Sequence, residues 1–176
     1  MGDDAKPKTF LESIPGDKLE LFQKFFNDTI PHNKALGTVV TAVRQGGASM
    51  RLDWQRHLVG NPETGVLHGG AITAMLDACS GMAVATMLSK PQPFATLDLR
   101  IDYVHPAVPG KPVLADAECV RITANVAFTR AVAHHGDPAD PIASSAGTFL
   151  MATKGQPPMG APAADVAATV PKGKRK

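Results

Sequence analysis

Aromatic residues and cysteines are scarce in this chain of 176 residues, which contains one Trp, one Tyr, seven Phe and two Cys. Nucleic acids are usually held by aromatic side chains within a basic surface, so this composition argues against a nucleic-acid partner. Cys79 and Cys119 lie among apolar residues without a CxxC pair, and they are too few for a disulfide framework. We expect both to be reduced thiols in the core.

Long apolar runs are also missing. No uninterrupted stretch approaches the ~18 residues that a membrane-spanning helix requires. The acidic start, Met1–Lys6, is not followed by the apolar segment of a secretory signal. We therefore expect a cytoplasmic protein without a membrane partner.

The formal net charge of +2 depends on the end of the chain, because four of the 18 Lys and Arg lie in the last five residues. Without them, 14 basic residues face 16 acidic ones, a balance of −2. From residue 155 the sequence has too few large apolar groups to offset the entropy of ordering. We predict a disordered tail over 155–176, a single domain over 12–154 and a flexible N-terminus over 1–11.

The first predicted helix begins after Asp17, a capping residue that Glu20 follows at the spacing of a capping box. Apolar residues then recur at helical spacing from Leu19 to Ile30, and Pro31 interrupts the pattern. This indicates a short amphipathic helix.

Two strands joined by a hairpin at 45–47 are predicted within residues 35–57. The Gly, Asn and Pro of residues 58–70 predict an ordered loop rather than a regular element.

A helix buried on nearly all sides is predicted from Ala71 to Leu88. Its polar interruptions, Thr73, Asp77 and the pair Ser80-Gly81, are three or four residues apart and should share one stripe. Gly81 weakens a helix by ~1 kcal/mol relative to Ala, so we expect another backbone to approach it closely, as in a dimer contact.

Residues 96–103 alternate strictly between a polar face that includes Thr96 and an apolar face that includes Tyr103. Three more strands are predicted at 113–122, 125–134 and 142–152. One buried helix followed by consecutive strands predicts an α+β domain, in which an antiparallel β-sheet wraps around a long central helix.

Candidate chemistry gathers at the start of that helix. Gly69 and Gly70 would place unpaired N–H groups, with the positive end of the helix dipole, where a developing oxyanion can be held. Asp77 is a carboxylate on an otherwise apolar helix, which is costly unless it is hydrogen-bonded or kept for chemistry. Asn61 adds an amide in the loop before the helix. Together these groups are suited to the hydrolysis of a carbonyl compound.

Residues 61–70, Asn-Pro-Glu-Thr-Gly-Val-Leu-His-Gly-Gly, with Asp77 seven residues later, resemble the hotdog-fold acyl-CoA thioesterases of the phenylacetate-pathway (PaaI-like) type. Residues 96–107 and Gly110 are similar to the strand and turn that follow the helix in that family. The resemblance implies hydrolysis of an acyl- or aryl-CoA to the free acid and coenzyme A, without a cofactor or metal. It also implies a homodimer, or a dimer of dimers.

The resemblance assigns roles to individual residues. Asn61 and the Gly69 amide would position the thioester, and Asp77, contributed across the dimer interface, would act as nucleophile or general base. Thr96 stands where some members hold the attacking water with a hydroxyl. Two flanking residues, His68 and Gly70, are predicted to contact the substrate.

Each role has a structural alternative. Asn61 could serve merely as a turn cap, and His68 could stabilise the loop by hydrogen bonding. The two glycines could be present only because the backbone conformation requires glycine. His134-His135 lacks a third ligand at metal spacing, so we predict a solvated strand end there. Arg100, Arg130 and the basic tail are weak candidates for binding the CoA phosphates.

Two other functions share the expected fold. A hotdog hydratase or dehydratase would need a different acid–base pair, and its Gly-Asp-x-Asn-Pro-x-His run is not found in the sequence. A non-catalytic acyl-CoA-binding protein would ordinarily bring a second, effector domain.

Overall fold

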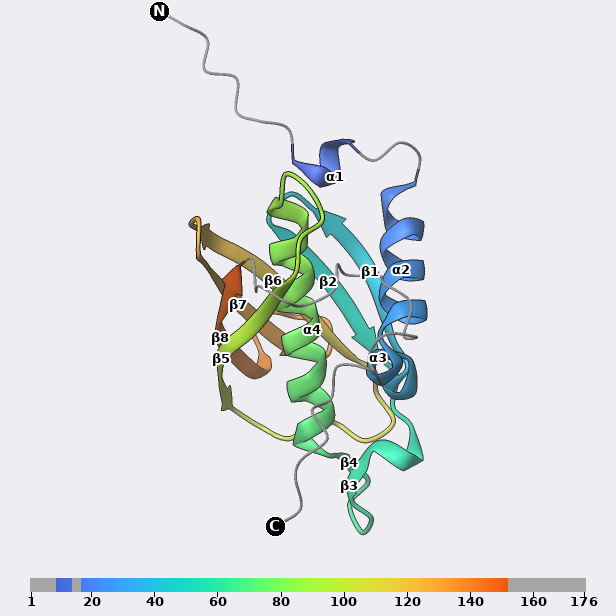
Figure 1. Cartoon of the computed structure of the whole chain (residues 1–176). Helices are drawn as coiled ribbons and strands as arrows, with labels where there is room; N and C mark the ends of the chain where they lie inside the picture. Colours follow the sequence, from blue (N-terminus) through green and yellow to red (C-terminus); the bar gives the residue numbers. More distant parts are fainter. Residues whose placement is uncertain (1–8, 14–16, 152–176) are drawn as a thin grey trace, which may run out of the picture.

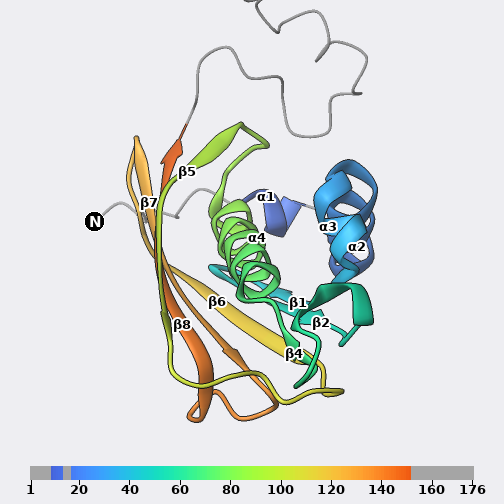
Figure 2. The same cartoon turned by 90° about the horizontal axis from the view of Figure 1, so that it is seen from below.

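The computed structural model describes residues 9–13 and 17–151. Its main feature is a six-stranded antiparallel sheet that bends around one long helix, α4 (Figures 1 and 2). The strands lie in the order β1-β2-β6-β7-β8-β5. Their bounds are β1 (Thr38–Arg44), β2 (Gly47–Leu52), β5 (Phe94–Tyr103), β6 (Val113–Ile122), β7 (Val126–His134) and β8 (Pro141–Met151). The predicted α+β architecture, with an antiparallel sheet wrapped around a central helix, is confirmed.

The central helix α4 (Gly69–Met87) is buried on most sides, as its uniformly apolar sequence predicts. Met75, Leu76, Cys79 and Met82 are fully buried, and the helix packs mainly on β6, β2 and β7. Both cysteines are buried free thiols, also as predicted. The helix begins two residues earlier than the apolar pattern indicated, because its first two positions are glycines.

Three helices precede the sheet: α1 (Phe10–Ser13), α2 (Lys18–Thr29) and α3 (Pro31–Leu36). The predicted cap of α2 is present, since Asp17 Oδ1 accepts hydrogen bonds from the N–H groups of Leu19 and Glu20. Pro31 ends α2 but starts α3, where its missing N–H is no loss. Helix α2 packs against β1 at one edge of the sheet (Figure 1).

Residues 9–11, which the sequence assigned to a flexible N-terminus over 1–11, are among the described residues and are packed against the domain. Thr9 and Leu11 are buried, and α1 packs against α4. Residues 1–8 and the tail predicted from residue 155 lie outside the described residues.

The segment 58–70 is more regular than a loop. After the short 3-10 helix η1 (Arg56–Leu58), the strands β3 (Val59–Asn61) and β4 (Val66–Leu67) form a small hairpin that leads into α4 (Figure 1). The prediction of an irregular loop was wrong because a two- or three-residue strand is too short to show a periodic pattern.

Strand β5 departs from strict alternation. Its pairing with β8 is irregular between Thr96 and Asp98, so Leu97 is an extra residue at a bulge. The bulge reverses the parity of the strand, which explains why Thr96 and Tyr103, expected on opposite faces, both reach α4. The prediction of strict alternation from residue 96 to 103 is therefore wrong.

Candidate active site

The N-terminus of α4 is capped by the residue that precedes it. His68 is the N-cap, and its Nδ1 atom accepts a hydrogen bond from the Gly70 N–H (2.9 Å). A Cβ at Gly70 would lie only 2.8 Å from that nitrogen, so this cap requires glycine. His68 thus serves as a helix cap, and the Gly70 amide predicted to contact substrate is already occupied.

Gly69 contacts a residue that sequence reasoning did not select. The Tyr103 hydroxyl donates a hydrogen bond to the Gly69 carbonyl (2.5 Å) and lies 2.9 Å from the Thr73 hydroxyl. A Cβ at Gly69 would be 3.0 Å from the Tyr103 oxygen. The Gly69 N–H has no acceptor among the described residues, so it is the free amide of this helix end.

Nothing local marked Tyr103 as a site residue, because it lay on the apolar face of the predicted strand. The available signal was Thr73, a polar residue in the second turn of a buried helix that needs a partner on the neighbouring strand.

Asp77 lies two turns further along α4 and is hydrogen-bonded to strand β5. The Thr96 hydroxyl donates to Asp77 Oδ1 (2.9 Å). Burial raises the pKa of Asp77 above its ordinary value, and the hydrogen bond from Thr96 opposes this shift without cancelling it. A half-buried carboxylate with a raised pKa and one donor retains the basicity that proton abstraction or nucleophilic attack requires.

Asn61 is not brought to these groups. It ends β3, and its side-chain oxygen accepts hydrogen bonds from the N–H groups of Glu63 (3.0 Å) and Thr64 (3.4 Å). This is the turn-capping role given as its alternative. No hydrogen bond joins Asn61 to Asp77, Thr96 or Gly69 in the described part of the chain.

The candidate groups form two half-sites on one chain. Gly69 and Tyr103 border a surface cleft of about 390 Å³, whose lining does not include Asp77. Eight residues of helix at ~1.5 Å each separate Gly69 from Asp77 by ~12 Å along the axis. A single carbonyl group cannot touch both in one chain.

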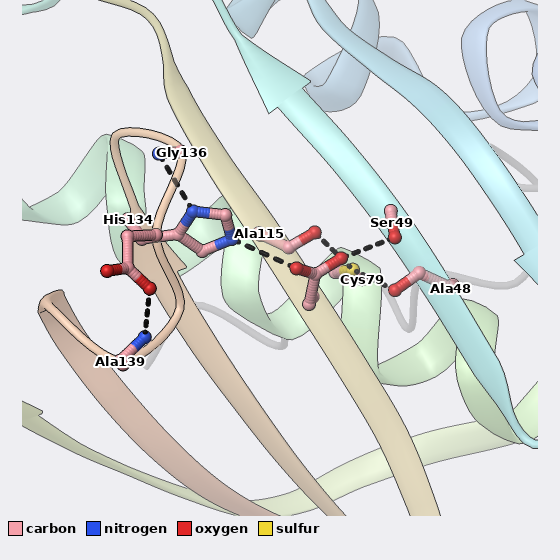
Figure 3. A network of polar contacts seen from close by, with 9 residues as sticks. Ala48, Ser49, Cys79, Ala115, His134, Gly136 and Ala139 are labelled. Atoms are coloured by element: carbon pink, nitrogen blue, oxygen red, sulfur yellow. Dashed lines mark hydrogen bonds and ion pairs between the residues drawn. The ribbon is translucent and has the colours of Figure 1, made fainter.

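A second polar network lies on β2, β6 and β7. Asp116 accepts hydrogen bonds from the Ser49 hydroxyl and from His134 Nε2. His134 Nδ1 accepts from the Gly136 N–H (3.0 Å), and Figure 3 labels Ser49, His134 and Gly136 in this network. Burial raises the pKa of Asp116, but the bonds from Ser49 and His134, with the nearby charges, outweigh it, and the net pKa is lowered. Because Asp116 separates serine from histidine, the arrangement lacks the serine–histidine contact of a nucleophilic triad.

The prediction of a solvated strand end at His134-His135 is wrong. His134 is 3% exposed, and His135 contacts the Pro112 carbonyl and the Val108 N–H. These neighbours come from distant segments, which a sequence pattern does not reveal. Across the described segments there is no group of three or more metal-ligating side chains.

The expectation for Gly81 is not met within the chain. A Cβ at Gly81 would lie 3.5 Å from the ring of Phe94 and 3.6 Å from the ring of Phe149. The nearest neighbours outside the helix are therefore side chains and not another backbone.

Comparisons with known proteins point to one family. The family model of the thioesterase superfamily matches residues 64–142, which include α4, β5, β6 and β7. A Pseudomonas aeruginosa protein with a provisional esterase name is 30% identical over 108 residues, or 61% of this chain and 76% of that protein. The chain belongs to the thioesterase superfamily. A Halobacterium salinarum protein that is also named as an esterase is 33% identical over 94 residues, which are 52% of this chain. The chain spans only 61% of that protein's length.

Solved structures agree on the fold. A crystal structure from Pseudomonas aeruginosa is 44% identical with a TM-score of 0.67, covering 75% of this chain and 97% of that one. A mutant of the phenylacetic acid degradation protein PaaI from Thermus thermophilus is 26% identical with a TM-score of 0.60, covering 69% and 98%. The chain therefore has the hotdog fold and belongs to the PaaI type of the thioesterase superfamily. None of the helices in the described ranges is long and apolar enough to cross a membrane.

Proposed function

We propose that this thioesterase hydrolyses acyl-CoA thioesters to the free acid and coenzyme A, in composite sites shared by two copies of the chain. The observation that carries the proposal is Asp77, a half-buried carboxylate on a buried helix, with a raised pKa and a supporting hydroxyl from Thr96. A purely structural carboxylate would normally be satisfied by more donors.

The proposed chemistry uses Asp77 of one copy and the Gly69 N–H of the other. In the first route, Asp77 removes a proton from a water molecule while that water attacks the thioester carbonyl. In the second, the Asp77 carboxylate itself attacks the carbonyl, and water then hydrolyses the anhydride that has formed. The Gly69 amide stabilises the oxyanion, and the C–S bond breaks as the CoA thiolate leaves and is protonated. Thr96 orients the carboxylate, and both routes give the same products.

Strand β5 supports self-association. It is the last strand of the sheet, and no strand within the described residues pairs with its outer edge. It is ten residues long and exposes apolar side chains, including Leu97 (56% exposed) and Tyr103 (49%). A long apolar edge of this kind is a template for pairing with another chain. We assign it to a second copy.

Antiparallel pairing of two β5 strands would unite the half-sites. Asp77 is tied to Thr96 near the start of the strand, and Gly69 is tied to Tyr103 at its end. In this arrangement a two-fold axis near Arg100 would place the start of each strand opposite the end of the other. If the bulge at Leu97 keeps that residue out of the pairing, as it does with β8, Thr96 would lie opposite the partner's Tyr103. Each dimer would then contain two equivalent sites. Association of two dimers into a tetramer stays a prediction.

The direct test is release of free thiol from a panel of acyl- and aryl-CoA esters, with the acid product identified. We expect hydrolysis of at least one ester at a rate proportional to enzyme concentration. Binding of acyl-CoA without turnover would overturn the proposal in favour of a binding protein. Hydration of an enoyl-CoA would indicate the rival enzyme class.

A further inference from the structure

The start of α4 holds one free N–H group between two occupied ones. The His68 N–H donates to the Leu58 carbonyl (2.8 Å), and the Gly70 N–H donates to His68 Nδ1 (2.9 Å). The Ala71 N–H donates to the His68 carbonyl (3.0 Å). A helix end normally leaves such donors to solvent or to a ligand. Of these four groups, the Gly69 N–H alone has no acceptor within the part of the chain that the structure describes.

Two side chains hold the peptide group that follows this free N–H. The peptide group between Gly69 and Gly70 accepts a hydrogen bond at its carbonyl from the Tyr103 hydroxyl (2.5 Å). The N–H of the same peptide group donates to His68 Nδ1. Because only the Gly69 Cα separates this planar group from the one that carries the free N–H, holding the first limits rotation of the second.

Both glycines are required by these two contacts. A Cβ at Gly69 would lie 3.0 Å from the Tyr103 oxygen, and a Cβ at Gly70 would lie 2.8 Å from His68 Nδ1. Both glycines are helical and neither has a positive φ, so the backbone conformation alone does not require glycine. The glycine pair therefore makes room for the two side chains that hold the peptide group.

Tyr103 is itself held by a second hydroxyl. Its oxygen lies 2.9 Å from the Thr73 hydroxyl, which donates to it because Tyr103 gives its own proton to the Gly69 carbonyl. The Tyr103 side chain is 49% exposed, so burial in the core does not fix its orientation, whereas the two hydrogen bonds do. Gly69 and Tyr103 also border the same surface cleft, where a substrate can reach the free N–H.

We propose that Tyr103 is a positioning residue for thioester hydrolysis. Its hydroxyl holds the Gly69 carbonyl, and this keeps the Gly69 N–H directed at the point where the oxyanion develops. The inference rests on the proposed function and adds a residue to it. An oxyanion donor accelerates the reaction because it is oriented in advance, so loss of this orientation lowers kcat rather than substrate affinity. Tyr103 transfers no proton in this role.

The first test is Tyr103→Phe, which keeps the ring and removes the hydroxyl. We expect kcat to fall about tenfold, less than the ~10²-fold or more for complete loss of an oxyanion donor, and KM to stay within about twofold. The acid limb of the kcat/KM profile should not move, because the bond between Thr96 and Asp77 is intact. Ser144→Ala is the control. It removes a β8 hydroxyl that makes no hydrogen bond within the described residues, and it should change neither constant.

A double-mutant cycle tests whether Tyr103 acts through Gly69. Gly69→Ala keeps the N–H, but its Cβ displaces the Tyr103 hydroxyl, so kcat should again fall about tenfold. The double variant should be no more than about twofold worse than either single variant, since both changes remove the same contact. Losses that multiply to about a hundredfold would show two independent effects and would overturn the inference.

Nuclear magnetic resonance measures the order of the Gly69 N–H without turnover. Tyr103→Phe should lower the order parameter of this group from about 0.85, the value of a rigid backbone, toward about 0.6. An unchanged order parameter would overturn the inference.

The remaining outcomes separate the role of Tyr103 from the proposed function. If the wild type hydrolyses esters and Tyr103→Phe keeps its kcat, the inference alone fails. A wild type inactive toward every ester would overturn the proposed function instead. A loss of a hundredfold or more in Tyr103→Phe, with a shift of the basic limb of the profile, would show that Tyr103 transfers a proton itself and does not act through Gly69.

Discussion

Asp77 and Asp116 are both carboxylates that accept a hydrogen bond from a hydroxyl, yet their surroundings shift their pKa values in opposite directions. Asp77 accepts one side-chain hydrogen bond, from Thr96, and burial keeps its pKa raised. Asp116 accepts hydrogen bonds from Ser49 and His134, and its pKa is lowered. An undersatisfied carboxylate retains basicity for chemistry, whereas a well-satisfied one contributes to stability.

The two carboxylates should also affect stability with opposite signs. A raised pKa in the folded state means that the ionised form of Asp77 opposes folding at neutral pH. A lowered pKa means that ionised Asp116 favours folding above the unfolded pKa, and that this contribution is lost as pH falls through the folded value. Replacing each aspartate by asparagine therefore distinguishes a carboxylate that serves catalysis from one that stabilises the fold.

The largest effect is expected for Asp77→Asn. We expect kcat to fall by ~10²-fold or more, since the variant loses its base or nucleophile but keeps its shape. The melting temperature at neutral pH should not decrease, because the charge that opposes folding is removed. Turnover close to wild type in the folded variant would end the catalytic assignment of Asp77.

Complementation tests whether the half-sites come from two copies. Gly69→Pro removes the free N–H at the first helical position, where proline is tolerated, and Asp77→Asn removes the carboxylate. Co-refolded as a statistical mixture, the two inactive proteins should regain up to about one quarter of wild-type activity per chain, because a mixed dimer holds one intact site.

Circular dichroism must show that Gly69→Pro is folded, since the Tyr103 ring has to move aside. If verified mixed dimers are no more active than their parents, the two groups act within one chain.

A smaller effect is expected at the hydroxyl that supports Asp77. Thr96→Val should lower kcat about tenfold, the scale of one lost hydrogen bond to a charged group. Because that bond lowers the pKa of Asp77, its removal should also move the acid limb of the kcat/KM profile to higher pH. Thr96→Ser keeps the hydroxyl and should match wild type in both measurements. An unchanged acid limb in Thr96→Val would show that Asp77 does not control it.

The smallest effect on activity is expected for Asp116→Asn. Turnover should stay within about twofold of wild type, while unfolding at neutral pH should become easier by about 1–2 kcal/mol as charge-assisted hydrogen bonds weaken, a modest value because the carboxylate is partly solvated. Urea titrations should show this difference disappearing as pH falls through the native pKa of Asp116. A large loss of activity without a loss of stability would move Asp116 into the site.

Much of the site could be predicted from short patterns. The cap at Asp17, the apolar run of α4 and the spacing between Gly69 and Asp77 all concern residues within a few turns of one another, where helix geometry is already determined. The family resemblance singled out Thr96 as a residue that holds the attacking water, but its hydrogen bond to Asp77 was not predicted. Tyr103 was missed because its role depends on the parity of β5, which a single bulged residue reverses.

Local sequence signals determine the elements of this protein, whereas contacts between distant segments depend on how the whole domain packs. The 3.6-residue period and the capping preferences act on neighbouring residues, so the two long helices α2 and α4, most strands and the free N–H at Gly69 follow from the sequence. Contacts across the sheet depend on register, and register is set by packing of the whole domain. Only the tertiary structure therefore placed Tyr103 against Gly69, buried His134 beside Asp116 and left an apolar pocket between α2 and the C-terminal end of α4.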